Sequence, residues 1–259
     1  MSALPHLTTK PPTVLVTGAS KLLGREIALL LATNGWQVAI HYRDSVNDAT
    51  KTVADCARLT RGAAAFRCNL GNETAVRNLI PTVVEAFGYL DAVVHSASTF
   101  EHDTPQNFSF AAMEKHMRSN AGAAILLSQA LHAHLVQRNK GIAAEAWAKG
   151  AVVNLLDQKL WNQSPDFVSY TLSKAALDAA NSMLAMALQP LVRVVGVAPE
   201  VSLAQPMLKG ETLAALKKRL PNAMTATALD TAAAVLLALQ DAKLSGTTLL
   251  VTDSGVAHA

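Results

Sequence analysis

Short apolar segments alternate with longer amphipathic ones along most of the chain, and this alternation restricts the fold more than any other feature. Seven apolar segments have the length and side-chain content of buried strands. They span residues 13–16, 37–41, 63–68, 92–95, 151–156, 192–197 and 247–251. Six segments with helical periodicity separate them, at residues 25–34, 48–60, 73–87, 110–137, 168–188 and 227–239. Because strands that alternate with helices pair in parallel, we predict an α/β fold with a doubly wound parallel sheet of about seven strands.

The length and composition fit one domain. The chain has 259 residues, of which 51% are hydrophobic and 16% charged, enough to bury one sizeable core. We predict a flexible N-terminal tail at residues 1–12 and a single domain at 13–259. Two longer connections, at 139–150 and 199–226, interrupt the alternation. Because long connections after strand ends often cover substrates, we expect a substrate lid around 199–226.

Charge, hydropathy and cysteine content exclude several kinds of partner. The chain carries 22 Lys and Arg against 19 Asp and Glu, a net charge of +3 with no basic block, so we expect no binding to nucleic acid or to a membrane surface. No apolar run approaches the ~18 residues of a membrane span. Cys56 and Cys68, without a secretory signal, indicate a reducing compartment and lack metal-ligand spacing. We predict a cytoplasmic protein that binds a small-molecule substrate and no metal.

A glycine-containing turn lies between the first predicted strand and the first helix. Gly18 and Gly24 let the backbone approach a pyrophosphate closely, and the amides of a helix N-terminus bind anions. An ordinary turn whose glycines serve packing would have the same pattern. We expect a dinucleotide here, held by Gly18, Ser20, Lys21, Leu22, Leu23 and Gly24.

The end of the second predicted strand favours NADP over NAD. Sites for NAD usually place an acidic residue there to accept the ribose 2′-OH, and no acid lies between Glu26 and Asp44. Arg43 offers a planar fork of donors for a 2′-phosphate, although it also fits a solvated loop charge, and contact of Asp44 with the ribose would weaken the preference. The predicted contacts at this end are Lys21, His41, Tyr42, Arg43 and Ser45.

Tyr170 and Lys174 lie one helical turn apart at the start of the predicted helix that follows the fifth strand. An ammonium group beside a phenol favours the phenolate and lowers the pKa of the tyrosine from its usual value of about 10. Such a tyrosine can exchange a proton with a carbonyl or an imine. The spacing also occurs by chance on helix surfaces, but its place in this fold favours chemistry.

Several motifs, in order along the chain, resemble those of the short-chain dehydrogenase/reductase family. They are Thr17-Gly18…Gly24, His95-Ser96-Ala97-Ser98, Asn120, Tyr170…Lys174 and Ala198-Pro199, and the resemblance covers about residues 13–255. It implies a Rossmann-type fold in which Tyr170 donates a proton, Lys174 holds the nicotinamide ribose and tunes Tyr170, and Asn120 positions a water. It also implies cofactor contacts from Asn69, Leu70, Ser96, Ala97, Ser98, Pro199, Val201 and Ser202.

Within this family the chain looks most like the pteridine reductase and dihydromonapterin reductase branch. The segments that carry this resemblance are 17–21, 41–45, 97–100 and 154–157. It implies that Asp157, where most of the family has Ser, acts with Tyr170 to protonate a ring nitrogen, a task that suits a carboxyl group. A capping or salt-bridged acid is the alternative for Asp157. Phe100 would stack on a flat heterocycle, or serve as a core residue. Trp161, Leu203 and Met207 are candidates for the pocket wall, or for packing.

Five residues depart from the resemblance, and two of them are Ser96, which replaces the usual Asn after the fourth strand, and Ser254, which interrupts the usual Asp-Gly-Gly near the C-terminus. Leu22 stands where the pterin reducers carry an Arg that reaches the pyrophosphate and the pterin, and where the wider family has Gly. Asn69 stands where an Asp usually meets the adenine, although its amide oxygen still accepts a hydrogen bond. Glu200 replaces a Gly after Pro199.

Taken together, these residues predict an NADPH-dependent reductase that transfers hydride to a C=N bond of a pterin, such as a dihydropterin or dihydrofolate-like compound. One alternative is an NADP-dependent carbonyl or 3-oxoacyl-type reductase of the same family. Another is a non-catalytic NADP(H)-binding protein. The resemblance also implies a homotetramer, with subunit contacts from the helices around 113–137 and 166–190.

Overall fold

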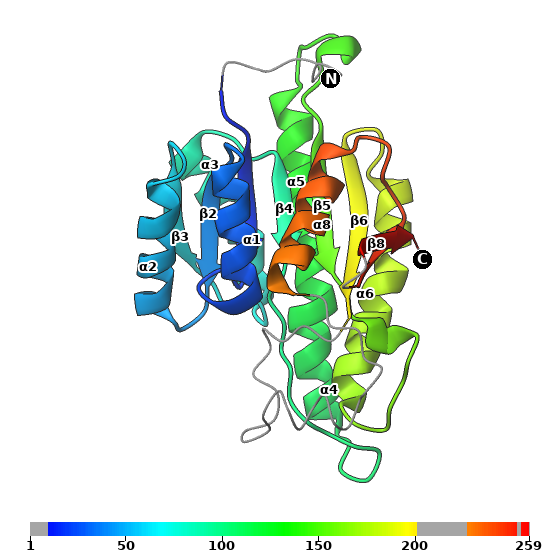
Figure 1. Ribbon diagram of the computed structural model, residues 1–259. Helices are drawn as coiled ribbons and strands as arrows, with labels where there is room; N and C mark the ends of the chain where they lie inside the picture. The colour runs from blue at the N-terminus through cyan, green and yellow to red at the C-terminus, as the bar shows by residue number, and fades with distance from the viewer. Residues whose placement is uncertain (1–9, 201–226, 253–254, 259) are drawn as a thin grey trace.

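The computed structural model describes residues 10–200, 227–252 and 255–258. One sheet runs through the molecule, with strand order β3-β2-β1-β4-β5-β6-β7-β8 (Figure 1). The first seven strands pair in parallel and β8 pairs antiparallel to β7. The strands are β1 (Thr13–Thr17), β2 (Gln37–Tyr42), β3 (Ala63–Arg67), β4 (Ala92–His95), β5 (Gly150–Leu155), β6 (Val192–Pro199), β7 (Thr248–Thr252) and β8 (Gly255–His258).

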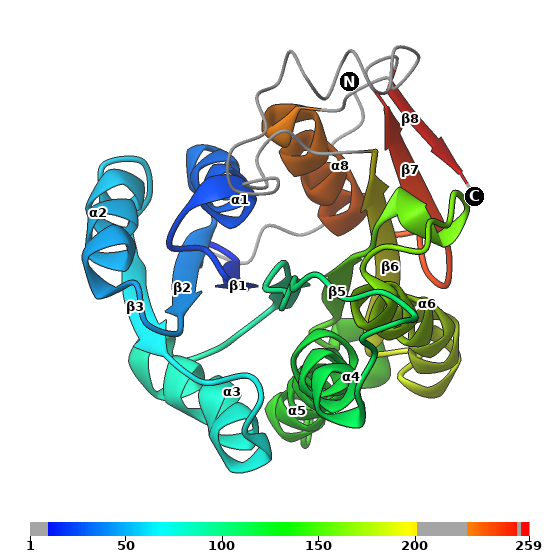
Figure 2. The ribbon, with the colours of Figure 1, turned by 90° about the horizontal axis from the view of Figure 1, so that it is seen from below.

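Helices cover both faces of this sheet. Figure 2 shows α1, α2 and α8 on one face and α3, α5 and α6 on the other. The helices are α1 (Leu22–Thr33), α2 (Val46–Ala57), α3 (Glu73–Phe87), α4 (Phe110–His116), α5 (Ala123–Arg138), α6 (Val168–Ala187) and α8 (Ala228–Gln240). None of the helices in the described ranges is long and apolar enough to cross a membrane.

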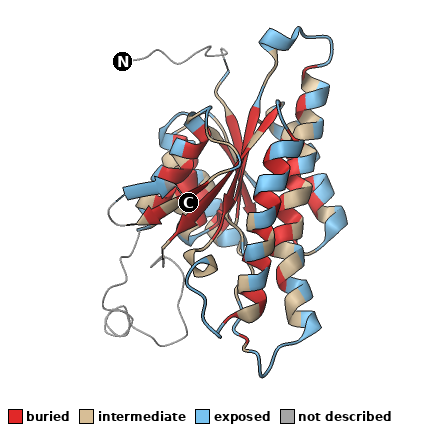
Figure 3. Ribbon diagram, turned by 90° about the vertical axis from the view of Figure 1, so that its right-hand side faces the viewer, coloured by how far each residue is buried: buried red, intermediate tan, exposed pale blue. Residues whose placement is uncertain are grey.

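The core forms because alternate residues of each strand face opposite helical layers. On β1, Val14 and Val16 pack in the cluster that includes Ile27 of α1 and Val235 of α8, whereas Leu15 packs in the cluster that includes Leu131 of α5. The central strands β1, β4, β5 and β6 are buried on both faces, as Figure 3 shows for the middle of the sheet. This two-sided burial explains why the strand sequences are almost continuously apolar.

The predicted α/β fold is confirmed, with β4 and α3 ending at the predicted residues. Two details differ. The helix expected over 110–137 is interrupted by a π-helical segment, Met117–Gly122, that separates α4 from α5. The strand β8 was not predicted, because its four residues carry no clear strand pattern. Most of the predicted tail (1–12) and of the predicted lid (199–226) lies outside the described residues.

Candidate active site

The glycine turn leaves the carboxyl end of β1, between β2 and β4, where the strand order reverses. Gly18 has a φ of 67°, and a Cβ atom there would lie 2.9 Å from the Cα of Ala97. A Cβ atom on Gly24 would lie 2.4 Å from the carbonyl oxygen of Gly18. Both glycines are therefore required by the tight path of the turn, and the approach of a pyrophosphate to them stays a prediction.

Leu22, the first residue of α1, has a φ of 54°. This left-handed conformation suits glycine and costs a leucine roughly 1–2 kcal/mol. The backbone at Leu22 is therefore strained. It keeps the conformation that a glycine would adopt, but the residue carries a half-exposed apolar side chain.

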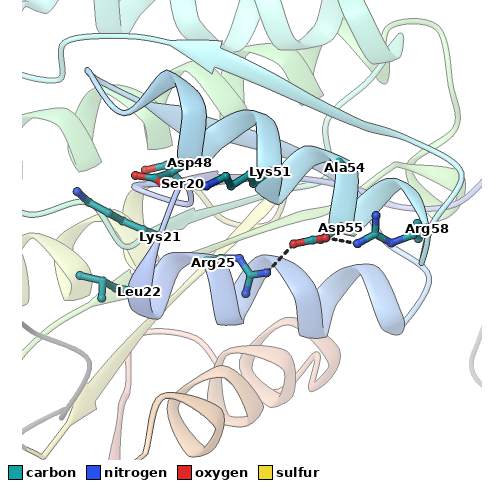
Figure 4. A pocket seen from close by; sticks show the side chains of 9 residues that line it. All are labelled: Ser20, Lys21, Leu22, Arg25, Asp48, Lys51, Ala54, Asp55 and Arg58. Atoms are coloured by element: carbon teal, nitrogen blue, oxygen red, sulfur yellow. Dashed lines mark hydrogen bonds and ion pairs between the residues drawn. The ribbon is translucent and has the colours of Figure 1, made fainter.

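The N-terminus of α1 is open to an anion. Its N-cap residue, Lys21, makes no capping side-chain bond, and the first turn holds no acidic residue. Beside it a cleft of about 510 Å³ opens between α1 and α2 (Figure 4). Lys51 points toward Ser20 in this cleft, while Arg25 is paired with Asp55 at 2.6 Å. The helix dipole and the lysines favour phosphate groups here, although the carboxylate of Asp48 also lines the cleft.

A second cleft, of about 530 Å³, lies at the end of β2. Its charged residues are Arg43, Asp44 and Arg67, with Nε of Arg43 2.7 Å and a guanidinium nitrogen of Arg67 3.9 Å from the Asp44 carboxylate. Two cations therefore surround one anion, so the carboxylate that competed with the NADP prediction is neutralised by its neighbours. Asn69 also lines this cleft, and its side-chain oxygen accepts from the amide of Gly71.

His41 does not lie where a contact with a 2′-phosphate requires it. The side chain is buried, with its Nδ1 accepting from the amide of Gly18 and its Nε2 bonded to the carbonyl of Cys68, each at 3.0 Å. Because both ring nitrogens form hydrogen bonds inside the protein, His41 stabilises the glycine turn through the Gly18 amide. The sequence showed the residue type but not its burial.

Tyr170 and Asp157 meet at the carboxyl end of β5. The hydroxyl group of Tyr170 donates to a carboxylate oxygen of Asp157 at 2.7 Å. Tyr170 comes from the first turn of α6, and Asp157 follows β5 and accepts from the amide of Lys159 at 2.9 Å. The carboxyl group is thus held by the backbone and directed at the phenol, which brings together the two groups predicted to share a proton.

Lys174 is buried one turn further along α6. Its ammonium group donates to the carbonyl of Leu155 at 2.6 Å and lies 5.7 Å from the centre of the Tyr170 ring. Burial lowers the pKa of Lys174 to about 8, while the negative charge of Asp157 acts in the opposite direction. The lysine is therefore anchored at the end of β5, beside the tyrosine that it was predicted to tune.

Asn120 lies in the π-helical segment, next to α6. Its side-chain oxygen accepts from the amide of Thr99 at 2.7 Å, and its nitrogen donates to the Thr99 carbonyl and to the hydroxyl of Ser173. The side chain of Asn120 thus fixes the loop after β4 to α6. A π-helical turn is frequent at functional sites because it shifts one residue out of the regular helical path.

A buried carboxylate fixes the start of α6. Asp103 accepts from the amide of Ser169 at 3.1 and 3.2 Å and from its hydroxyl at 2.5 Å, and its carbonyl accepts from the amide of Phe167. Because Ser169 precedes Tyr170, this anchor sets the position of the phenol. The sequence analysis missed Asp103, since a single acid in a loop gives no signal before the fold is known.

An aromatic group stands beside the phenol. Phe100 stacks on Phe167, with ring centres 4.4 Å apart, and meets Tyr170 edge-on at 4.7 Å. The ammonium group of Lys159 lies 4.3 Å from the centre of the Phe167 ring. One face of Phe100 is therefore covered by the protein itself, and stacking of a substrate on it stays a prediction.

Of the other predicted contacts, some lie within the described residues and some outside them. Leu70 and Pro199 are buried, Tyr42, Ser96 and Ala97 are half-buried, and Ser98 and Trp161 are exposed. Val201, Ser202, Leu203 and Met207 lie outside the described residues. Gln158, which was not predicted, donates to the carbonyls of Ala198 and Val251 and joins the ends of β6 and β7.

Comparison with known proteins agrees with this fold. The sequence matches the short chain dehydrogenase family over residues 12–212. The chain belongs to this family. The alternative dihydrofolate reductase 1 FolM from Brucella canis, solved with NADP, is 26% identical, with a TM-score of 0.79 over 93% of this chain and 92% of that one. A short chain dehydrogenase from Burkholderia cenocepacia, also solved with NADP, is 29% identical, with a TM-score of 0.82 over 94% and 97%.

Two curated relatives of this chain align with it over shorter stretches. A substituted succinyl-CoA dehydrogenase subunit from Thauera aromatica is 30% identical over 141 residues, which are 53% of this chain and 56% of that protein. A 3-oxoacyl-acyl-carrier-protein reductase from Staphylococcus aureus is 39% identical over 83 residues, which are 32% of this chain and 34% of that protein.

Proposed function

We propose that the protein is an NADPH-dependent reductase of a C=N bond in a pterin, of the dihydropterin or dihydrofolate class. The observation that carries this proposal is the hydrogen bond between the Tyr170 hydroxyl and the Asp157 carboxylate. A carboxyl group can carry a proton to a basic ring nitrogen, whereas reduction of a carbonyl needs only a neutral donor to its oxygen. The likeness to the FolM reductase of Brucella canis supports the same substrate class.

The described residues fit a phosphorylated dinucleotide. The uncapped N-terminus of α1 and the close approach at Gly18 and Gly24 suit its pyrophosphate. Arg43 and Arg67, which outnumber Asp44, suit a 2′-phosphate at the adenosine end. When bound, the nicotinamide supplies the hydride.

The protein's own residues then supply the proton. The phenol gives its proton to the substrate nitrogen, and Asp157, which is only partly buried, takes up a proton from solvent and returns it to the phenolate along the hydrogen bond that the two groups share. Lys174, held at the Leu155 carbonyl, places a positive charge beside the phenol and stabilises its phenolate form. Phe100 and Phe167 form an apolar wall that keeps water from this side of the phenol.

A second candidate is a carbonyl or 3-oxoacyl-type reductase, which the likeness to the Staphylococcus aureus enzyme favours. In that case Asp157 only orients the substrate, while Tyr170 protonates the carbonyl oxygen. A non-catalytic NADP(H)-binding role has less support, because a binding protein has no need of the assembled Tyr170, Asp157 and Lys174.

The test is a comparison of substrates with two variants. Oxidation of NADPH is followed at its absorbance maximum with dihydrofolate, dihydromonapterin and dihydrobiopterin, and separately with a ketone and a 3-oxoacyl thioester. We expect turnover of at least one pterin. Asp157→Ser, which restores the usual family residue, should lower pterin turnover by about 100-fold or more, and Asp157→Asn should do the same. Turnover of carbonyl compounds alone would contradict the pterin proposal, and NADPH binding without any turnover would favour the binding protein.

A further inference from the structure

Two buried histidines, on the strands that flank β1, hold the start of the glycine turn. His41 on β2 accepts from the amide of Gly18 through Nδ1 and contacts the carbonyl of Cys68 through Nε2. An amide can only donate and a carbonyl can only accept, so the His41 ring is neutral and carries its proton on Nε2. The main-chain carbonyl of His41 also accepts from the amide of Ala19 at 3.0 Å.

His95 on β4 has the same arrangement. Its Nε2 lies 3.2 Å from the carbonyl of Asn120, which makes Nε2 the donor, and its Nδ1 lies 3.2 Å from the hydroxyl oxygen of Thr17. The hydroxyl of Thr17 therefore donates to His95, and its oxygen accepts from the amide of Ala97 at 3.0 Å. The two rings hold neighbouring residues of the turn from opposite sides of β1.

Burial keeps both rings in this neutral form. His41 is 2% exposed and His95 is fully buried, and loss of solvation lowers the pKa of His41 to about 4 and that of His95 to about 3. The nearby Lys174 and the His41 ring lower the pKa of His95 further. Neither histidine belongs to the predicted proton path, so the arrangement that they share needs another explanation.

We propose that His41 and His95 are positioning residues for dinucleotide binding, whose neutral rings fix Gly18 and Thr17 in the orientation that the glycine turn needs. His41 turns two successive amides, those of Gly18 and Ala19, toward β2. The amides that follow, at the N-terminus of α1, are then directed outward to a pyrophosphate. His95 links the same turn to Asn120 and so to the loop that adjoins the phenol. The inference rests on the proposed dinucleotide and not on the proposed substrate.

The first test reads the tautomers in the intact protein. Nitrogen-15 NMR of the histidine rings, at neutral pH and with the unmodified chain, distinguishes a protonated from an unprotonated ring nitrogen. We expect Nε2 protonated and Nδ1 unprotonated in both His41 and His95. A protonated Nδ1 in His41 would overturn the proposal, because such a ring cannot accept from Gly18.

The second test compares two substitutions of His41. In His41→Asn the short side chain keeps an oxygen near the position of Nδ1, so the acceptor for Gly18 is retained. In His41→Gln the longer side chain keeps a donor near the position of Nε2 but loses that acceptor. We expect His41→Gln to raise the Kd for NADPH, measured by fluorescence titration, by about tenfold, and His41→Asn by less than about threefold.

The matched control is His134→Gln. His134 also accepts from a backbone amide, that of Leu90, but lies at the opposite end of the sheet, so the Kd for NADPH should not change. A role in filling space alone predicts the reverse order at His41, because Gln is closer in size to His than Asn is. Equal affinities of the two His41 variants would overturn the proposal. If the unmodified protein binds no NADPH, the proposed function fails and not this inference. If the His41 variants do not fold, the nitrogen-15 spectrum of the unmodified chain remains the test, and a protonated Nδ1 in His41 still overturns the inference.

Discussion

Lowering the pH from 7.5 to 5 should destabilise the folded protein through His41 and His95. The unfolded chain binds a proton on each histidine near pH 6.5, whereas the folded chain does so only near pH 4 and pH 3. Between these values the unfolded state binds more protons, so the free energy of unfolding falls as the pH falls. At pH 5 each ring then lowers stability by about 2 kcal/mol, or about 4 kcal/mol together.

Urea unfolding at pH 7.5, 6 and 5, followed by circular dichroism, measures this loss. Asp55 and Asp230 do not interfere, because their lowered pKa values place their titration below this range. His134 acts in the same direction, since partial burial lowers its pKa, and the His134→Gln variant removes its contribution. The His41→Asn variant should lose about 2 kcal/mol less than the unmodified chain over the same range. A stability that changes by less than about 1 kcal/mol in the unmodified chain would refute the reasoning.

Three further predictions concern the turn and the start of α6. Leu22→Gly should raise the free energy of unfolding by about 0.5–1 kcal/mol, since relief of the left-handed leucine exceeds the added chain entropy, and a lower melting temperature would contradict this. Gly24→Ala should weaken NADPH binding at least tenfold in a fluorescence titration, because its Cβ meets the Gly18 carbonyl at 2.4 Å; affinity equal to that of the unmodified chain would show that the turn yields. Asp103→Ala should cost about 2–4 kcal/mol in urea unfolding by leaving the Ser169 amide and hydroxyl without their acceptor, and Asp103→Asn, which keeps one acceptor oxygen, should cost about half as much.

The order of β1 to β7 and of the helical segments between them could be predicted from the sequence, because burial of the central strands on both faces leaves a clear apolar pattern. The bounds of α3 also agree with the prediction, because local signals set them. Asn72 caps its first turn by accepting a hydrogen bond from the Ala75 amide, and Gly88 ends the helix with a φ of 85°. The pairing of Tyr170 with Asp157 could also be anticipated, since both follow from motifs with a known order.

The rest depended on tertiary contacts that no local pattern records. His41 has ring nitrogens that could contact a phosphate, but only the structure shows that Gly18 and Cys68 already occupy both of them. The π-helical turn at Asn120 has the composition of an ordinary helix. Asp103 becomes important only because the fold brings it to Ser169, 66 residues away along the chain.

The pairing of β1 with β4 has a consequence for how the protein folds. Thr17 and His95 are 78 residues apart, and the bond between them forms only when two strands from distant parts of the chain have joined. Closing so long a loop costs entropy before any contact repays it, so this step is expected to be slow. During refolding, the recovery of NADPH binding, followed by nicotinamide fluorescence, should therefore be slower than the recovery of the helical circular dichroism signal. Nascent chains shorter than about the first hundred residues would have secondary structure but no affinity for the dinucleotide.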